Sequence, residues 1–134
     1  MRSTSILRKE DGQAMVELAF VLPILVAVML GIVQFGIVFN NYVTMTDAAR
    51  AGARKAAVSR FLHDDGAAAK ALVYADATSL NRDTLDVNVA ASPDWTTAGG
   101  EVTVTASYPY SIDILGIVVV KDGTLTTTTK ERLE

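Results

Sequence analysis

One long apolar stretch dominates the pattern of hydrophobic and polar positions: the segment from Leu18 to Phe39 has no ionisable side chain. Its interruptions are Pro23, Gly31, Gln34 and Gly36. A helix of this length reaches about 33 Å, close to the hydrocarbon thickness of a bilayer. A soluble helix of that length would need a polar face, and this stretch has none. The pattern therefore predicts a membrane-spanning helix.

Small residues dominate the pattern immediately after the span. They form two neighbouring rows at four-residue spacing: Ala48, Gly52 and Ala56, then Ala49, Ala53 and Ala57. Basic side chains at 50, 54 and 55 lie towards the other side of the same helix. We expect the span to continue as one helix to about Phe61. Its small-residue face would pack on its own domain or on neighbouring helices.

A break at Asp64-Asp65-Gly66 predicts the end of this helix and the cap of a second one, from Ala67 to about Leu80. The positions expected to be partly buried on the second helix are Ala68, Leu72, Tyr74 and Ala75. His63 stands beside two aspartates, but three adjacent loop residues cannot all face one ion. We therefore expect no metal site there.

Residues 85–90 and 101–108 alternate between apolar and polar side chains, as half-buried strands do. Turn residues surround Trp95 between them, and the pair predicts a hairpin that Pro109 is expected to end.

The apolar residues 112–120 are either a third strand or a patch that touches the membrane surface. Gly123 is expected to turn the chain into a further strand at 125–129, before a charged tail. Residues 81–134 would thus form an antiparallel sheet of three to four strands packed on the long helix, an α+β fold.

The chain divides into four regions by composition. Residues 1–12 are a short charged leader, 13–39 the span, 40–80 the helical extension with the second helix, and 81–134 the sheet. No small-residue cleavage site follows the apolar run, so the span is expected to remain as an anchor. Basic residues flank it on both sides, but long downstream segments cross membranes with little regard to charge. We expect the N-terminus inside the cell and the domain outside.

Composition narrows the function classes. The net charge of −3 gives no general attraction to nucleic acid, and the absence of cysteine excludes disulfides and thiolate metal sites. The chain carries no nucleophile elbow, zinc-protease motif or phosphate loop. We therefore expect no enzyme, no catalytic residue, no cofactor and no nucleic-acid partner.

The motif Gly12-Gln13-Ala14-Met15-Val16-Glu17 resembles the processing site of type IVb prepilins, in which a glycine, four residues and a glutamate precede a long apolar helix. The wider segment is similar to the TadE-like family of pseudopilins and minor pilins. The shared features are the Val16-Glu17 pair, the early Pro23, the two glycines at 31 and 36, and the block from Ala48 to Arg54. The later segment 102–109 also resembles the family's C-terminal strand.

The resemblance implies a pilin-like fold and a defined site of action. A membrane prepilin peptidase would cut between Gly12 and Gln13, where a glycine in an extended peptide lets a protease approach closely. The protein would lie in the bacterial inner membrane before joining other pilins at the assembly platform of a tight-adherence (Flp) pilus or related secretion machine. Major pilins usually have tyrosine after the glutamate. Leu18 stands there in this chain, which points to a minor pilin or pseudopilin.

Glu17 is the candidate assembly residue. After the cut, Gln13 would carry a new α-amine, and Glu17 lies one helical turn further on. The carboxylate could pair with the amine of a neighbouring subunit, because an unpaired carboxylate in lipid is costly. The other interpretation is a glutamate that lies idle at the level of the headgroups.

The candidate helix-packing residues are Pro23, Gly31, Gly36, Ala49, Gly52 and Ala53. Small residues let membrane helices approach closely, and proline bends them. Simple tolerance of glycine and glutamine in a span explains Gly31, Gly36 and Gln34 equally well. For the whole chain, the alternative function is a single-pass, signal-anchored periplasmic binding module that keeps residues 1–12.

Overall fold

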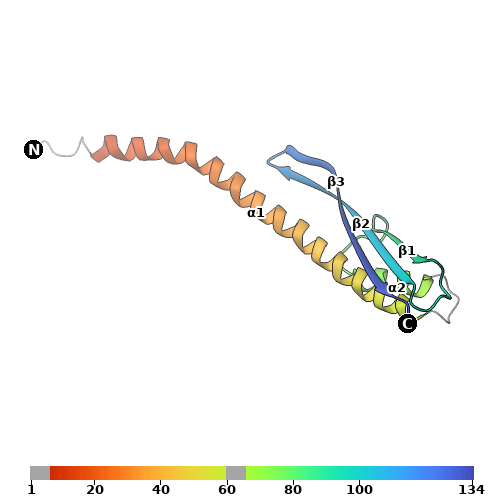
Figure 1. The fold of residues 1–134 in the computed structure, drawn as a ribbon. Helices are drawn as coiled ribbons and strands as arrows, with labels where there is room; N and C mark the ends of the chain where they lie inside the picture. Colours follow the sequence, from red (N-terminus) through yellow and green to blue (C-terminus); the bar gives the residue numbers. More distant parts are fainter. Residues whose placement is uncertain (1–6, 60–65) are drawn as a thin grey trace, which may run out of the picture.

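The fold combines one very long helix with a small sheet, which confirms the α+β class (Figure 1). The computed structural model describes residues 7–59 and 66–134. Its elements are α1 (Leu7–Ala57), α2 (Ala67–Asp76), β1 (Asp86–Ser92), β2 (Glu101–Ile114) and β3 (Ile117–Arg132). The three strands form one antiparallel sheet in the order β1-β2-β3.

Helix α1 is continuous from the leader into the domain. It begins at Leu7, so the expected border between leader and span at residue 12 is not a break in the helix. The helix also passes through Pro23, and Figure 1 shows it changing direction in its first half, as a proline in a helix allows. The expected end near Phe61 was too late. The backbone N–H and the hydroxyl of Ser59 both donate to the Ala56 carbonyl, at 3.1 and 3.0 Å, and close the helix at Ala57.

The second helix starts where the sequence predicts but ends at Asp76 rather than near Leu80. The Thr78 N–H turns back to the Asp76 carbonyl at 2.8 Å, which ends the helical pattern. Its N-cap is Gly66 in the left-handed conformation, without a side-chain cap. The segment around His63, where we expect no metal site, lies outside the described residues.

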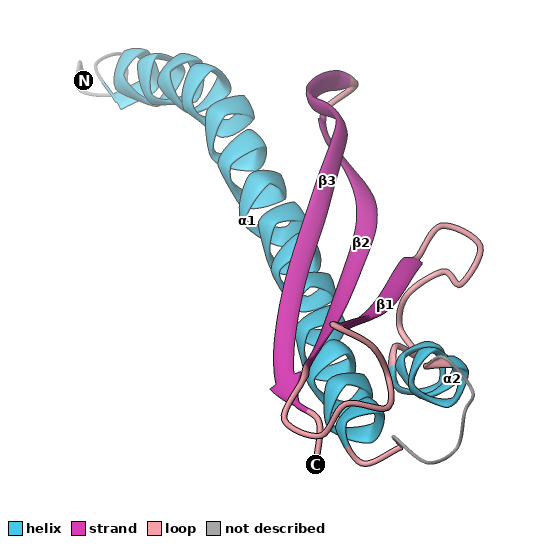
Figure 2. Ribbon diagram, turned by 45° about the vertical axis from the view of Figure 1, so that its right-hand side comes forward, coloured by secondary structure: helices cyan, strands magenta, loops and turns pink. Residues whose placement is uncertain are grey.

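The sheet is a meander whose second hairpin is much longer than its first. Figure 2 shows β2 and β3 running on beyond β1 and along α1. The predicted alternation holds in β2, where Val102, Val104 and Ala106 are buried between exposed or half-buried neighbours. The β1–β2 hairpin around Trp95 is confirmed, with Ser92 opposite Glu101.

Two residues expected to interrupt the sheet lie inside strands instead. Pro109 sits within β2 opposite Thr124. Because β1 pairs with β2 only as far as Ser107, this part of β2 has an open edge, where proline is tolerated. Gly123 lies within β3, where a β-carbon would come 2.6 Å from the Tyr110 ring. It is a close-packing position rather than a turn.

The core lies between the C-terminal half of α1, the inner face of the sheet and α2. Its α1 side consists of Met45 and of the two predicted rows of small residues, all buried. The sheet contributes mainly valines, and α2 contributes Ala69 and Val73. On α2 the expected Ala68, Leu72 and Tyr74 are half-buried, whereas Ala75 is exposed. Packing of this kind supplies most of the stability of a small domain.

The charged tail ends on a core residue that the sequence pattern did not reveal. Leu133 is buried, and its backbone bonds to Gly99 and Gly100 at 2.9 and 2.8 Å. The N–H of Glu134 donates to the Ala57 carbonyl at 3.2 Å. The C-terminus is therefore tied to the end of α1.

Candidate functional site

The predicted processing segment lies near the N-terminal end of α1. Gly12, Gln13 and Glu17 are all exposed and all helical. In the intact chain Gly12 lies inside helix α1, which starts five positions earlier. A β-carbon at Gly12 would meet nothing within 4 Å. The packing of this chain therefore gives no reason for a glycine at this position.

Glu17 lies one turn beyond Gln13, at the edge of an exposed apolar surface. Leu18, Phe20 and Val21 follow it, and each is exposed by 43% or more. Among the residues whose side chains the structure describes, Glu17 has no ion-pair partner. The geometry brings Gln13 and Glu17 together on one helix end and leaves both available to another molecule.

The apolar half of α1 is not covered by the domain. One helix in the described part of the chain is long and apolar enough to cross a membrane, and none of its most apolar window is buried. Phe35 and Phe39 stack on each other at 6.3 Å on its surface. The helix therefore suits a single-pass membrane anchor.

Comparison with known families concerns this same helix. Residues 12–54 match the TadE family model, described as TadE-like protein. This segment is TadE-like. The resemblance expected from the sequence is thereby confirmed over residues 12–54, which include the span and the first four of the six small residues in the two rows. No curated protein and no solved structure matches the chain.

The small residues of the TadE-like segment fall into two groups with different surroundings. Ala49, Gly52 and Ala53 are buried inside the domain. A β-carbon at Gly52 would come 2.3 Å from Val73 Cγ2 and 3.3 Å from the Ala69 carbonyl, so α2 requires the glycine. These three residues pack within the chain rather than between chains.

The other group lies in the apolar half, where the chain itself provides little contact. A β-carbon at Gly36 would meet nothing within 4 Å, and Pro23 is exposed. At Gly31 the only contact would be Ile114 Cδ1, at 3.5 Å. Within the apolar run, Gly36 therefore remains open to a partner helix.

Gln34 has a partner that the sequence could not specify. Its side-chain amide donates to the Asp113 carbonyl, and the Asp113 N–H donates to its Oε1 at 3.1 Å. A lone glutamine in an apolar run signals a polar partner, which on sequence alone could be a local carbonyl or a neighbouring helix. The partner is instead the far end of β2, which the long hairpin brings back along α1.

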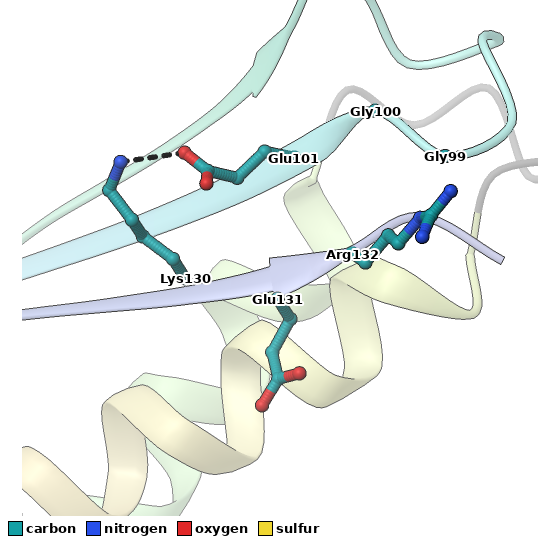
Figure 3. A pocket seen from close by; sticks show the side chains of 6 residues that line it. All are labelled: Gly99, Gly100, Glu101, Lys130, Glu131 and Arg132. Carbon is teal, nitrogen blue, oxygen red and sulfur yellow. Dashed lines mark hydrogen bonds and ion pairs between the residues drawn. The ribbon is translucent and has the colours of Figure 1, made fainter.

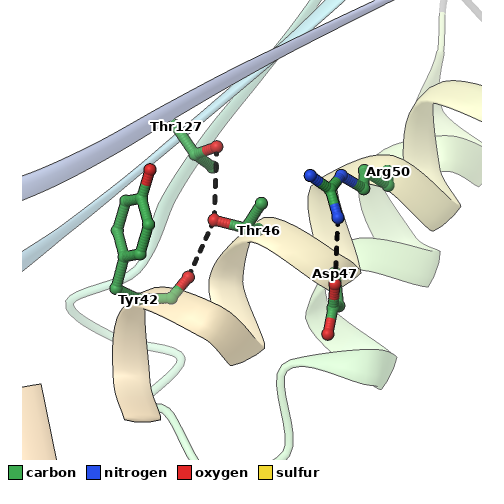
Figure 4. A network of polar contacts seen from close by, with 5 residues as sticks. All are labelled: Tyr42, Thr46, Asp47, Arg50 and Thr127. Atoms are coloured by element: carbon green, nitrogen blue, oxygen red, sulfur yellow. Dashed lines mark hydrogen bonds and ion pairs between the residues drawn. The ribbon is translucent and has the colours of Figure 1, made fainter. Parts of the chain in front are cut away.

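A short polar network marks the place where the two halves of α1 meet (Figure 4). The Thr46 hydroxyl donates to the Tyr42 carbonyl at 2.8 Å and lies 3.4 Å from the hydroxyl of buried Thr127 on β3. One turn further on, Arg50 pairs with Asp47 at 3.5 Å on the exposed side. Of these contacts, the one between Thr46 and Thr127 joins the sheet to α1 just beyond the apolar run.

A hollow at the opposite end of the sheet, formed by described residues, brings together no side chains suited to catalysis or metal binding (Figure 3). It is lined by Gly99, Gly100, Glu101, Lys130, Glu131 and Arg132. Lys130 Nζ lies 2.7 Å from Glu101 Oε1, so these charges neutralise each other, and Glu131 points to the other side of the sheet. In the described residues no group of three or more metal-ligating side chains converges.

Proposed function

We propose that this protein is a minor pilin or pseudopilin of a tight-adherence (Flp, type IVb) pilus or a related secretion machine, without catalytic activity of its own. The observation that carries the proposal is the TadE-like match from residue 12 to residue 54. It covers the processing motif, the span and the first part of the domain. At the level of the family, this supports a pilus-related protein.

Processing is the first part of the proposal: a prepilin peptidase cuts between Gly12 and Gln13. A glycine inside a helix costs about 1 kcal/mol relative to alanine. Nothing packed against Gly12 offsets that cost. A requirement outside the chain, such as close approach of a protease to the backbone, accounts for the glycine. The site lies near a helix end, and helix ends fray, so local unwinding can expose the bond.

Assembly is the second part: the α-amine of one processed subunit pairs with Glu17 of a neighbour. The exposed carboxylate beside an apolar surface supports this, because lipid burial of an unpaired carboxylate costs roughly 2.5–3.5 kcal/mol at mid-bilayer. Pairing relieves that cost and fixes the axial register. The partners are other pilins or pseudopilins and the inner-membrane assembly platform.

The proposed location follows from the same arrangement. The protein resides in the bacterial inner membrane as a single-pass protein, with a cytoplasmic N-terminus and a periplasmic domain, and then joins the pilus. The bilayer is its first partner. Nucleic acid is not a partner, given the net charge of −3.

Intact mass of the protein from its native membrane tests the processing step. We expect an N-terminus at Gln13 in the natural chain and retention of residues 1–12 in Gly12→Ala. The structure makes this variant informative, since its new β-carbon meets nothing within 4 Å and cannot disturb the fold. Gly36→Ala is the matched control, also without contacts, and should be cut normally. An uncut natural chain in a peptidase-competent cell would instead favour the signal-anchored binding module.

Glu17→Gln tests the assembly step separately. This variant should be cut after Gly12 as usual but should fail to co-purify with pili. Glu131→Gln, an exposed glutamate on β3, serves as the control and should assemble normally. Normal assembly of Glu17→Gln would reject the pairing while leaving the processing step intact.

A further inference from the structure

The tip of the β2–β3 hairpin is an exposed apolar surface that does not contribute to the core of the domain. Residues 114–120 contain no ionisable side chain, and the largest exposures belong to Leu115, Ile117, Val118 and Val119, at 54–69%. Charged residues begin only where the tip ends, with Asp113 on one strand and Lys121 and Asp122 on the other. An apolar tip flanked by charged residues suits the boundary between lipid and water, where the surroundings change from apolar to aqueous over a few residues.

The turn itself has an unusual composition. Leu115 and Gly116 connect Ile114 to its partner Ile117, and both have positive φ, 52° and 81°. Two-residue hairpin loops of this kind favour Asn, Asp or Gly at the first position. A leucine there costs backbone energy and exposes a large apolar side chain, which is unfavourable in water. An apolar environment would offset that cost.

The tip lies beside the apolar half of α1 (Figure 1). Gln34 holds Asp113 by two hydrogen bonds, and Gly31 faces Ile114. Gln34 is five positions before the end of the apolar run at Phe39, which places it about 7–8 Å inside that end. Amphipathic elements bound in the interface of a bilayer lie at a depth of roughly 5–10 Å. The hairpin therefore reaches the depth of an interfacial anchor.

The Gln34 contact reduces the cost of placing the edge of β2 at that depth. Unpaired backbone N–H and C=O groups are expensive in lipid. At Asp113, the outward N–H and C=O of β2 both bond to the Gln34 side chain. At Asp113 the open edge of β2 is thus satisfied by the span itself.

We propose that residues 114–120 are a second membrane contact, which inserts among the upper acyl chains of the outer leaflet beside the span. The partner that surrounds the apolar tip is phospholipid. Continuity with the exposed apolar face of α1, at the same level, selects lipid over water. The inference rests on residues 18–39 spanning a bilayer, and it does not depend on cleavage after Gly12 or on pilus assembly.

Site-specific fluorescence in vesicles tests this insertion, and the absence of native cysteine makes single labels direct. Val118→Cys reports on the tip, Thr126→Cys on the exposed lower part of β3, and Val28→Cys on the span. Each full-length variant carries an environment-sensitive dye in vesicles of phosphatidylethanolamine and phosphatidylglycerol. Nitroxide lipids, labelled high on the acyl chain, quench from the membrane, and iodide quenches from water.

The Val118 label should emit at shorter wavelength than the Thr126 label and should be quenched by nitroxide lipid but not by iodide. Iodide quenching of Val118 equal to that of Thr126, with Val28 still quenched by lipid, would overturn the insertion and leave the span standing. Protection of Val118 from both quenchers would also overturn it, in favour of contact with a second copy. A Val28 label open to iodide would overturn the span and the inference together.

Discussion

The two halves of α1 differ both in composition and in what covers them. From Leu18 to Phe39 the side chains are large, and most of them are exposed. From Met45 to Ala57 they are mainly alanine and glycine on the inner face, and that face is buried by the sheet and α2. Large exposed side chains suit lipid, whereas small buried ones let the backbone approach a sheet closely. One helix thus has a first half suited to lipid and a second half that packs in the core of the domain.

The sharpest test of this difference uses the same residue in each half. Met45→Ala should lower the free energy of unfolding of the domain by about 2–5 kcal/mol, because a fully buried methionine leaves a cavity. Met29→Ala removes an exposed side chain and should change it by less than about 0.5 kcal/mol. Urea unfolding of the full chain in detergent measures both. The single tryptophan, Trp95, which packs on Gly66, is the reporter. Equal effects at Met29 and Met45 would contradict the division of α1.

The glycines offer a second matched pair. Gly52→Ala should destabilise the domain by about 1–3 kcal/mol, because the new carbon overlaps Val73 Cγ2 at 2.3 Å. Gly36→Ala meets nothing and should leave the domain unchanged or slightly stabilise the helix. The same unfolding measurement applies. A neutral Gly52→Ala would show that α2 does not need the close approach.

The domain and the span should also differ in their response to acid, and this is the smallest of the expected effects. The pKa of Asp94 is lowered to about 2, because the Thr96 and Thr97 hydroxyls and N–H groups donate to its carboxylate. Its stabilising effect is therefore present above its ordinary pKa of 3.8 and is lost as the pH falls through about 2. The span has no ionisable group between residues 18 and 39 and should keep its helicity.

Unfolding curves between about pH 5 and pH 2 check this contrast. Asp94→Asn should remove part of the acid dependence of the domain. The helical circular dichroism of the span should stay constant. An Asp94 carboxyl that titrates by NMR near its ordinary value would contradict the proposed role of the two threonines.

Local patterns predicted most of the fold because they depend on neighbours in sequence. The length of the apolar run and the four-residue spacing of the small residues located α1, and alternation located β1 and the first part of β2. The errors came from long-range packing: Pro109 is tolerated at an open edge, and Gly123 makes room for the Tyr110 ring. Neither relation is visible in the sequence, because each depends on which strand lies alongside.

The candidate site shows the same limit. Gly12, Gln13 and Glu17 were selected by their resemblance to a prepilin processing motif, which is local in sequence, and their roles stay predictions. The Gln34–Asp113 contact joins positions 79 apart, and only the length of the hairpin brings them together. Leu133 was missed because a single leucine in a charged tail has no periodicity.

The central claim is that the first half of α1 lies in lipid and the second half in the domain. Its most direct test is labelling of single cysteines on α1 in intact spheroplasts with a membrane-impermeant maleimide. Arg54→Cys, on the exposed face of the domain half, should be labelled before lysis. Met29→Cys, equally exposed in the isolated molecule, should resist labelling until detergent removes the lipid. Equal labelling of both cysteines in intact spheroplasts would contradict the account.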